Sequence, residues 1–330
     1  MIVKMNIKEL AEQIGSFDDV LIVAHINPDP DTLGSALGLK RIFENLGKNA
    51  YVACGTEASD RICGYFGISP ELDAKKIEHF GFVPEYIVCV DAAAPSQLGS
   101  YEKYHSTEPE KNKIDLVIDH HYTNALYGKK TYLDTAAAAT GEIIFELSKE
   151  LGQPFDREFA KDLYCAIICD SGSFRYGSTT PKTLRAAAEL METGFDFAAL
   201  NRQIFQNKSH TQLAIERLAY NSLKFYHEGK IAVITITNEA KKAAGLEGVE
   251  IEDINEIAKS VEGVEVGVVI KQVGPGEFRI SLRSNEYVNV AQIAAIYGGG
   301  GHARAAGAKA ICCCAKELET ELVENLYEQI

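Results

Sequence analysis

Three short apolar runs in the first half of the chain each end directly before or at a residue able to do chemistry. They are VLIVA before His25, YIVCV before Asp91 and LVI before Asp119. Uninterrupted apolar strands that alternate with helical segments are typical of a parallel sheet covered on both faces. Because ligands of such sheets bind at the carboxyl ends of the strands, we expect these polar residues to meet at one edge.

The length of 330 residues suits two domains better than one hydrophobic core. We predict an α/β protein with a parallel-sheet N-terminal domain (1–205), a helical connector (206–224) and a smaller α/β C-terminal domain (225–330). In the first domain a further strand is expected at 51–53, with helices at 32–46, 140–151, 156–168 and 181–193. In the second, Gly274-Pro275-Gly276 between two β-rich runs predicts a hairpin. A helix at 290–297, a glycine cluster and a final helix follow.

The net charge of the chain limits which binding partners are expected. The formal net charge is −14, which disfavours tight binding of a long duplex, because that binding depends on many lysine and arginine contacts to phosphates. A small phosphate-bearing substrate, held by metals and a few basic groups, fits better. No run approaches the roughly 20 apolar residues of a membrane helix, and the N-terminus acquires polar residues too early for a secretory signal. We therefore expect a cytoplasmic protein without a membrane partner.

The eight cysteines are scattered and include no CxxC pair, which favours reduced thiols over a disulfide framework. The run Cys312-Cys313-Cys314 raises the question of a zinc site. If this run is a strand, neighbouring side chains point to opposite faces and cannot converge on one ion. We therefore expect structural cysteines there.

The segment HINPDPDTLGS places one imidazole and two carboxylates, His25, Asp29 and Asp31, between a predicted strand and a predicted helix. Asp29 and Asp31 are two residues apart, so in an extended turn they can lie on one side and reach two neighbouring ions. Pro28 and Pro30 stiffen that turn. An alternative role for Asp31 is to cap the helix, but capping does not account for His25 and Asp29 beside it.

Further acidic and imidazole side chains stand at other strand and helix ends: Asp91, the triplet Asp119-His120-His121, and Asp170. A lone aspartate after a strand is more often a cap or turn residue, but the set as a whole offers nitrogen and carboxylate oxygen without thiolate. Such donors suit manganese, magnesium or iron better than a structural zinc site. Two ions about 3.5–4 Å apart can clamp the attacking and leaving oxygens of a phosphoryl transfer.

The motifs HINPDPDTLGS, VDAAAPSQLG, IDHH and CDSGSFRY, in this order, resemble those of the DHH phosphoesterases. The resemblance implies that His25, Asp29 and Asp91 hold one ion, and that Asp91 bridges to a second ion. The ligands implied for that second ion are Asp31, Asp91, His120 and Asp170. It also implies that His121 faces the substrate phosphate and that Asp119 supports the histidines. Two departures from the family pattern, Pro30 and the run Ala92–Ala94, remove no ligand.

In the second half, GGGGHARAAG is similar to the glycine-rich motif of the DHH-associated substrate domain. Glycines let backbone N–H groups approach an anion closely, and nearby basic side chains add positive charge. A flexible turn is the alternative interpretation of a glycine run alone. The substrate-binding residues that the resemblance implies are Arg283, Ser284, Gly299, Gly300, Gly301, His302 and Arg304.

The resemblance implies a manganese-dependent phosphoesterase that releases mononucleotides from very short RNA or DNA, or converts 3′-phosphoadenosine 5′-phosphate to AMP. A homodimer is compatible with this family. Cyclic dinucleotides or their linear products are alternative substrates. An inorganic pyrophosphatase is disfavoured, because no lysine- and arginine-rich C-terminal domain is found. A catalytically silent nucleotide-binding module is the alternative from outside the enzymes.

Overall fold

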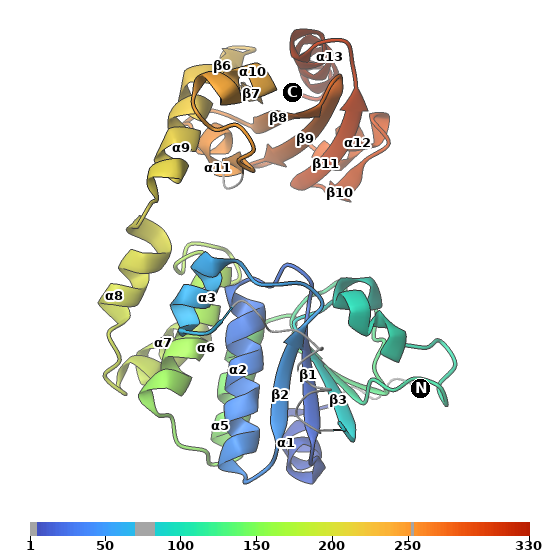
Figure 1. The fold of residues 1–330 in the computed structure, drawn as a ribbon, viewed down its shortest axis with the longest axis vertical. Helices are drawn as coiled ribbons and strands as arrows, with labels where there is room; N and C mark the ends of the chain where they lie inside the picture. The colour runs from blue at the N-terminus through green and yellow to red at the C-terminus, as the bar shows by residue number, and fades with distance from the viewer. Residues whose placement is uncertain (1–4, 70–82, 252–253) are drawn as a thin grey trace. The chain divides into compact units, whose positions relative to one another are not determined.

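The computed structural model describes residues 5–69, 83–251 and 254–330 (Figure 1). The chain divides into two compact units, Met1–Asn207 and Lys208–Ile330. The segment expected as a connector holds helix α9 (His210–Ser222), whose Ile215 and Ala219 are buried in a core of the second unit. None of the described helices is both long enough and apolar enough to cross a membrane.

Within the described residues, the first unit contains a five-stranded sheet in which every neighbouring pair is parallel. Its order is β2 (Ala50–Cys54), β1 (Val20–Ala24), β3 (Tyr86–Val90), β4 (Leu116–Asp119) and β5 (Lys130–Leu133). The strands expected from the three apolar runs, and the further strand expected at 51–53, are confirmed. The edge strand β5, KTYL, is not among the expected strands, because it is short and begins with an exposed lysine.

Both faces of this sheet are covered, as the unbroken apolar strands predict. Val88 and Val90 of β3 belong to the larger core, whereas Ile87 and Cys89 belong to a second core on the other face. The turns of η1 (Pro95–Tyr104) supply Leu98 and Tyr101 to that second core. The larger core is built with α1 (Ile7–Ser16), α2 (Pro30–Asn45), α3 (Asp60–Phe66), α5 (Thr140–Glu150), α6 (Arg157–Asp170), α7 (Pro181–Met191), α8 (Phe197–Asn201) and η2 (Arg202–Gln206).

A glycine sets the close approach of two of these helices. A Cβ atom on Gly141, in the first turn of α5, would lie 2.5 Å from the Cβ of Ala166 on α6. Real side chains do not tolerate such a distance, so this position requires glycine. The same Cβ would lie 3.4 Å from Oδ1 of Asp31. The bare backbone at the start of α5 can therefore reach the Asp31 carboxylate.

The second unit contains, within the described part of the chain, a mixed six-stranded sheet (Figure 1). Its order is β10 (Gly300–His302), β11 (Ala305–Ile311), β9 (Glu277–Ser284), β8 (Val266–Gly274), β7 (Ile231–Ile236) and β6 (Lys224–Tyr226). The expected hairpin is confirmed, since β8 and β9 pair antiparallel around Pro275. Strands β10 and β11 are not expected from the sequence, because glycine and alanine are poor strand formers. Here β11 pairs with β9, and β10 pairs with β11.

Helices pack on both faces of this sheet. Ile280 and Leu282 of β9 share a core with α12 (Val290–Ile296) and α13 (Ala315–Tyr327). On the other face, α9 and α11 (Asn255–Lys259) share a core with residues of β7 and β8, and the short helix α10 (Asn238–Ala243) follows β7. Because side chains alternate along a strand, Arg279 and Arg283 of β9 point to this second face.

Candidate metal centre

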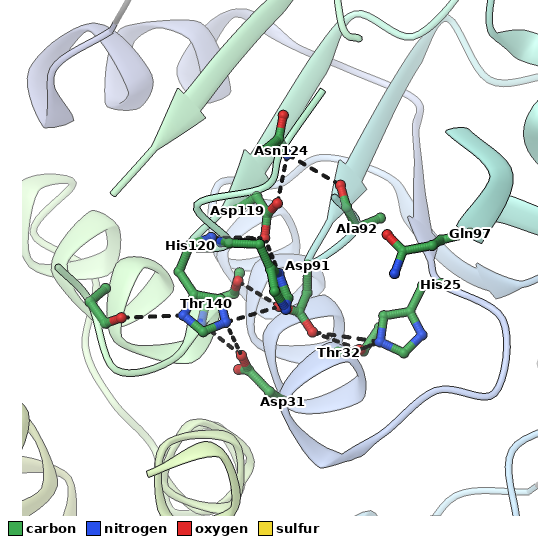
Figure 2. Close-up of polar contacts among 12 residues, drawn as sticks. His25, Asp31, Thr32, Asp91, Ala92, Gln97, Asp119, His120, Asn124 and Thr140 are labelled. Carbon is green, nitrogen blue, oxygen red and sulfur yellow. Dashed lines mark hydrogen bonds and ion pairs between the residues drawn. The ribbon is translucent and has the colours of Figure 1, made fainter. Parts of the chain in front are cut away.

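The carboxyl ends of β1, β3 and β4 bring the predicted side chains together (Figure 2). His25 follows β1, Asp91 follows β3, and Asp119 is the last residue of β4. Asp31 reaches the same region from the first turn of α2, and Asp170 from the end of α6. The edge expected from the sequence pattern is thus the edge at which these groups converge.

Asp91 lies at the middle of the cluster, and its side chain is buried. Its Oδ2 is 3.8 Å from Nε2 of His25. Its Oδ1 is 3.7 Å from Nε2 of His120 and 3.7 Å from Nδ1 of His121. The residue adopts a φ of 56°, a conformation that few non-glycine residues take and that often marks functional sites. The two carboxylate oxygens of Asp91 therefore face two different sets of side chains.

Those sets form two groups in which the potential ligand atoms all lie within 4.8 Å of one another. The first comprises His25, Asp29 and Asp91, and the second comprises Asp31, His120 and Asp170. A third such group joins Asp91 with both histidines of the triplet. All six residues expected as metal ligands are thus brought together by the fold.

The charges of the carboxyl groups suit a bound cation. Burial, followed by the nearby charge of Asp31, raises the pKa of Asp91 well above its usual value. Burial and the same neighbouring carboxylate raise the pKa of Asp170 to about 7. Buried carboxylates this close together repel each other unless a positive charge lies among them. The nitrogen and oxygen donors and their crowding both fit divalent metal ions.

Two threonines hold the central carboxylate, and sequence reasoning missed both. The hydroxyl of Thr32 donates to Oδ2 of Asp91 at 2.7 Å, and the hydroxyl of Thr140 donates to Oδ1 at 2.9 Å. Both threonines are buried. Thr140 lies 49 residues from Asp91 along the chain, so no local spacing in the sequence links them.

The N-terminus of α5 binds the carboxylate of Asp31. The backbone N–H of Thr140 donates to Oδ2 of Asp31 at 2.7 Å, and that of Gly141 donates to Oδ1 at 2.9 Å. Ser35 adds a hydroxyl donor at 3.0 Å. Free N–H groups and the positive end of the helix dipole favour a negative group at this position. Donors from the start of α5 and from its own helix α2 therefore fix the carboxylate of Asp31.

The helix cap on α2 differs from the alternative considered for Asp31. Asp29 is the N-cap residue, and its carboxylate accepts from the N–H of Thr32 at 2.9 Å, whereas Asp31 lies within the first turn. Pro30 at the first helical position is compatible with this start. Capping by Asp29 leaves its Oδ2 3.8 Å from Nε2 of His25. The carboxylate of Asp29 thus caps α2 through one oxygen and faces His25 with the other.

Asp119 orients His121. Its Oδ1 accepts a hydrogen bond from Nδ1 of His121 at 2.7 Å, and its Oδ2 accepts from Nδ2 of Asn124 at 2.6 Å. Burial opposes ionisation of Asp119, but these hydrogen bonds outweigh it and hold its pKa below the usual value. The bond to Asp119 in turn raises the pKa of His121. The side chain of His121 is 41% exposed against 13% for His120, so His121 is the more accessible of the two.

In the second unit, the predicted substrate residues lie along β9, β10 and β11. Arg283 pairs with Ala305, and Ala305 pairs with His302, so all three occupy one cross-strand row. The glycine run therefore begins in a turn at Gly298 and continues into the paired edge strand β10, in which Gly300 and Gly301 are exposed. Gly299 lies close against β11, since a Cβ there would be 2.2 Å from the carbonyl oxygen of Gly307.

Two of the predicted substrate residues make structural contacts within the second unit. Ser284 is buried, and its hydroxyl donates to the carbonyl of Val288 at 2.7 Å. Nη1 of Arg304 donates to the same carbonyl at 2.8 Å. Both side chains thus hold the turn before α12 against the hairpin that carries His302.

Comparison with known proteins agrees with this geometry. Residues 19–167 match the DHH family, N-terminal domain, and residues 228–329 match the DHHA1 domain. The chain belongs to the DHH family of phosphoesterases, whose members depend on metal ions. Its similarity extends to a bifunctional oligoribonuclease and PAP phosphatase, NrnA, of Thermus thermophilus. The two are 31% identical over 295 residues, which cover 88% of this chain and 83% of the relative.

Two more similarities extend over most of the chain. A protein of the same name from Bacillus subtilis is 26% identical over 304 residues, 91% of this chain and 92% of the relative. Among solved structures, an exopolyphosphatase-related protein from Bacteroides fragilis superposes with a TM-score of 0.84. It is 22% identical, and the match covers 97% of this chain and 95% of that one. At this identity the last similarity supports the fold alone.

Proposed function

We propose that this chain hydrolyses phosphate ester bonds in very short oligonucleotides and in 3′-phosphoadenosine 5′-phosphate, using two divalent metal ions. The observation that carries the proposal is the position of Asp91, whose two oxygens face two separate groups of ligand-type side chains. The curated relatives named as oligoribonuclease and PAP phosphatase, which match over most of their length, support this choice of substrates.

In this proposal His25, Asp29 and Asp91 hold one ion, and Asp31, Asp91, His120 and Asp170 hold the other. We propose manganese, because the donor set is imidazole and carboxylate without thiolate, with magnesium and iron as the alternatives. Bound ions of this kind lower the pKa of a water molecule and neutralise charge on the phosphate. The hydroxyls of Thr32 and Thr140 keep the Asp91 carboxylate in one orientation.

His121 is the proposed contact to the substrate phosphate. Asp119 fixes its ring through Nδ1, which leaves Nε2 as the free ring atom for a phosphate oxygen. The raised pKa of His121 favours the protonated ring, which is the better donor to an anion. Asp119 thus acts through His121 and not on the substrate directly.

The second unit is proposed to bind the nucleotide through Arg283, His302 and the backbone N–H groups of Gly300 and Gly301. The N–H of Gly299 donates to the carbonyl of Ala294 at 2.9 Å, so Gly299 is proposed to shape this site through its lack of a side chain. Ser284 and Arg304 complete this site by holding the adjoining turn. We further propose that the protein acts in the cytoplasm, where its eight free cysteines are compatible with reducing conditions, and that it forms a homodimer.

The test is a substrate panel with the full-length protein and Mn²⁺. An RNA dinucleotide, 3′-phosphoadenosine 5′-phosphate, linear and cyclic di-adenylate and pyrophosphate would be incubated separately and the products resolved by chromatography. We expect mononucleotides from the dinucleotide and AMP from the phosphoadenosine phosphate. Phosphate released from pyrophosphate alone would contradict the assignment, and turnover of none of the substrates would favour a silent binding module.

Variants of the proposed bridging residue sharpen this test. Asp91→Ala should abolish turnover and lower the number of metal ions bound per chain, while far-ultraviolet circular dichroism stays unchanged. Asp18→Asn is a matched control, because Asp18 lies before β1 at the opposite end of the strand and is exposed. Full activity in Asp91→Ala would refute the bridging assignment.

A further inference from the structure

The cysteine run 312–314 lies at the corner between β11 and α13 (Figure 1). β11 ends at Ile311, and Cys314 is the N-cap of α13. The three residues are therefore not a strand, and the expectation that neighbouring thiols point to opposite faces does not hold. The backbone N–H of Cys312 donates to the carbonyl of Gly276 at 2.9 Å, so the β8–β9 hairpin fixes the start of the run.

Packing accounts for at most one of these three cysteines, because only Cys312 packs against the core that β9 shares with α12 and α13. Cys54, Cys63, Cys89 and Cys165 are buried, as free thiols in a protein core usually are. Cys313 and Cys314, in contrast, are exposed, and Cys312 is only partly buried. An exposed thiol gains little from the hydrophobic effect, so this effect does not explain Cys313 and Cys314.

Two of the thiols share one carboxylate oxygen. Sγ of Cys313 lies 2.6 Å from Oε2 of Glu317, and Sγ of Cys312 lies 3.5 Å from the same atom. The three potential ligand atoms all lie within 4.8 Å of one another. In a tetrahedral zinc site with Zn–S bonds of about 2.3 Å, neighbouring sulfur ligands are roughly 3.8 Å apart. Small side-chain rotations therefore suffice to form such a site.

The helix adds to this arrangement. Glu317 is in the first turn of α13, where the positive end of the helix dipole favours carboxylate and thiolate groups. The hydrogen bond to Glu317, followed by one to Cys314, raises the pKa of the Cys313 thiol to about 12. Metal binding at this position would therefore release the thiol protons.

We propose that Cys312, Cys313 and Glu317 form a binding site for one thiolate-preferring divalent cation, Zn²⁺, distinct from the metal centre of the first unit. Two thiolates and one carboxylate suit zinc and leave a fourth position for water. The site would join the β8–β9 hairpin to the start of α13. It lies at the Ile311 end of β11, whereas the glycine motif pairs with the Ala305 end, about 20 Å away along the strand.

Cobalt substitution tests the proposal on the full-length, reduced protein. Thiolate ligands give Co²⁺ an intense near-ultraviolet charge-transfer band, which the histidine and aspartate groups of the first unit do not give. Because the metal centre of the first unit also takes up Co²⁺, we expect the band to reach a plateau whose intensity corresponds to one thiolate-bound Co²⁺ per chain, and to disappear when Zn²⁺ is added. It should be absent from the double variant Cys312→Ser/Cys313→Ser, and Glu317→Gln should weaken cobalt binding.

Cys314→Ser is the matched control, because Cys314 neighbours the site but is not one of its three proposed ligands; this variant should keep the band. Circular dichroism would establish that each variant is folded. Phosphoesterase activity with Mn²⁺ should be unchanged in all of them, so failure of this proposal is distinguishable from failure of the proposed function. Absence of the band in the wild type, or its survival in the double variant, would overturn the proposal.

Discussion

The hydrogen bonds around Asp119 allow its charge to be separated from its geometry. In Asp119→Asn, the side-chain oxygen can still face the backbone N–H groups of His120 and His121, which donate to Oδ1 at 2.8 and 3.2 Å. The new amide nitrogen then faces Nδ2 of Asn124, which donates to Oδ2 at 2.6 Å in the wild type. Two donors would point at each other. Asn124 cannot simply rotate, because its Oδ1 accepts from the N–H of Leu126 at 2.7 Å.

The double variant Asp119→Asn/Asn124→Asp exchanges the two roles. The amide of residue 119 now donates to the carboxylate of residue 124, and the other oxygen of that carboxylate still accepts from Leu126. The exchange removes the hydrogen bond that Asn124 donates to the carbonyl of Ala92 at 3.3 Å. That carbonyl also accepts from the hydroxyl of Tyr127 at 3.0 Å, so the cost in stability should be small.

The single and the double variant should therefore differ in stability but not in activity. Asp119→Asn leaves a buried donor unpaired, which costs about 1–3 kcal/mol of the free energy of unfolding, and the double variant should regain most of it. Neither variant has a carboxylate hydrogen-bonded to Nδ1 of His121, because in the double variant the negative charge has moved to residue 124, one hydrogen bond further away. Loss of such a supporting contact lowers activity by roughly 10–100-fold, and we expect that decrease in both.

The assays are denaturant unfolding, monitored by circular dichroism, and dinucleotide hydrolysis at saturating Mn²⁺. Asn124→Asp alone completes the double-mutant cycle. If the double variant recovers the hydrolysis rate together with the stability, Asp119 acts only through local folding, and the inference that its charge orients His121 is refuted. Recovery of neither quantity would refute the exchange of hydrogen-bond roles.

Three further perturbations test other parts of the molecule. Thr140→Val removes the hydroxyl that donates to Asp91 and should lower the hydrolysis rate by about 10–100-fold; Thr140→Ser keeps the donor and should stay within severalfold, as steady-state kinetics would show. Gly299→Ala brings a Cβ to 2.2 Å from a backbone oxygen of β11, whereas Gly300→Ala meets no atom within 4 Å. Unfolding in urea should therefore show a loss of about 1–3 kcal/mol for the first and under about 0.5 kcal/mol for the second. Burial raises the pKa of Asp162 to about 7, so the folded state keeps a proton that the unfolded state loses, and stability falls as pH rises from about 4 to 7. Asp162→Asn removes this pH-dependent contribution to stability. The free energy of unfolding of the variant, relative to that of the wild type, should therefore rise with pH by at most about 1.4 kcal/mol per pH unit. A difference in free energy of unfolding that does not change with pH would contradict the raised pKa of Asp162.

The elements that sequence predicts well are those in which a local pattern carries the information. The expected strands are apolar at every position in Val20–Ala24, Tyr86–Val90 and Leu116–Ile118. The structure explains this pattern, because alternate residues of these strands pack into two different cores on the opposite faces of the sheet. The meeting of His25, Asp91 and the DHH triplet follows from the parallel order of the strands. This convergence can be predicted from strand order alone, without knowledge of the distances between the side chains.

The features that sequence missed arise from contacts between distant segments. Thr140 donates to Asp91 because Gly141 lets α5 approach α6, and neither the threonine nor the glycine stands out locally. Strand β11 reads AAGAKAI, which has little strand propensity of its own, and forms because β9 offers a long edge. Ser284 is the last residue of a predicted strand, but its burial depends on a turn that the sequence does not specify.

The cross-strand row of Arg283, Ala305 and His302 fixes the distance between the backbones of its two basic residues. Neighbouring strands lie about 4.8 Å apart, so the backbones of the two basic residues are held roughly 10 Å apart. Backbone hydrogen bonds set this separation, and changes in loop length elsewhere leave it untouched. Ala305 lies between the two basic residues in this row, so the size of the side chain at position 305 determines how much room remains between the side chains of Arg283 and His302.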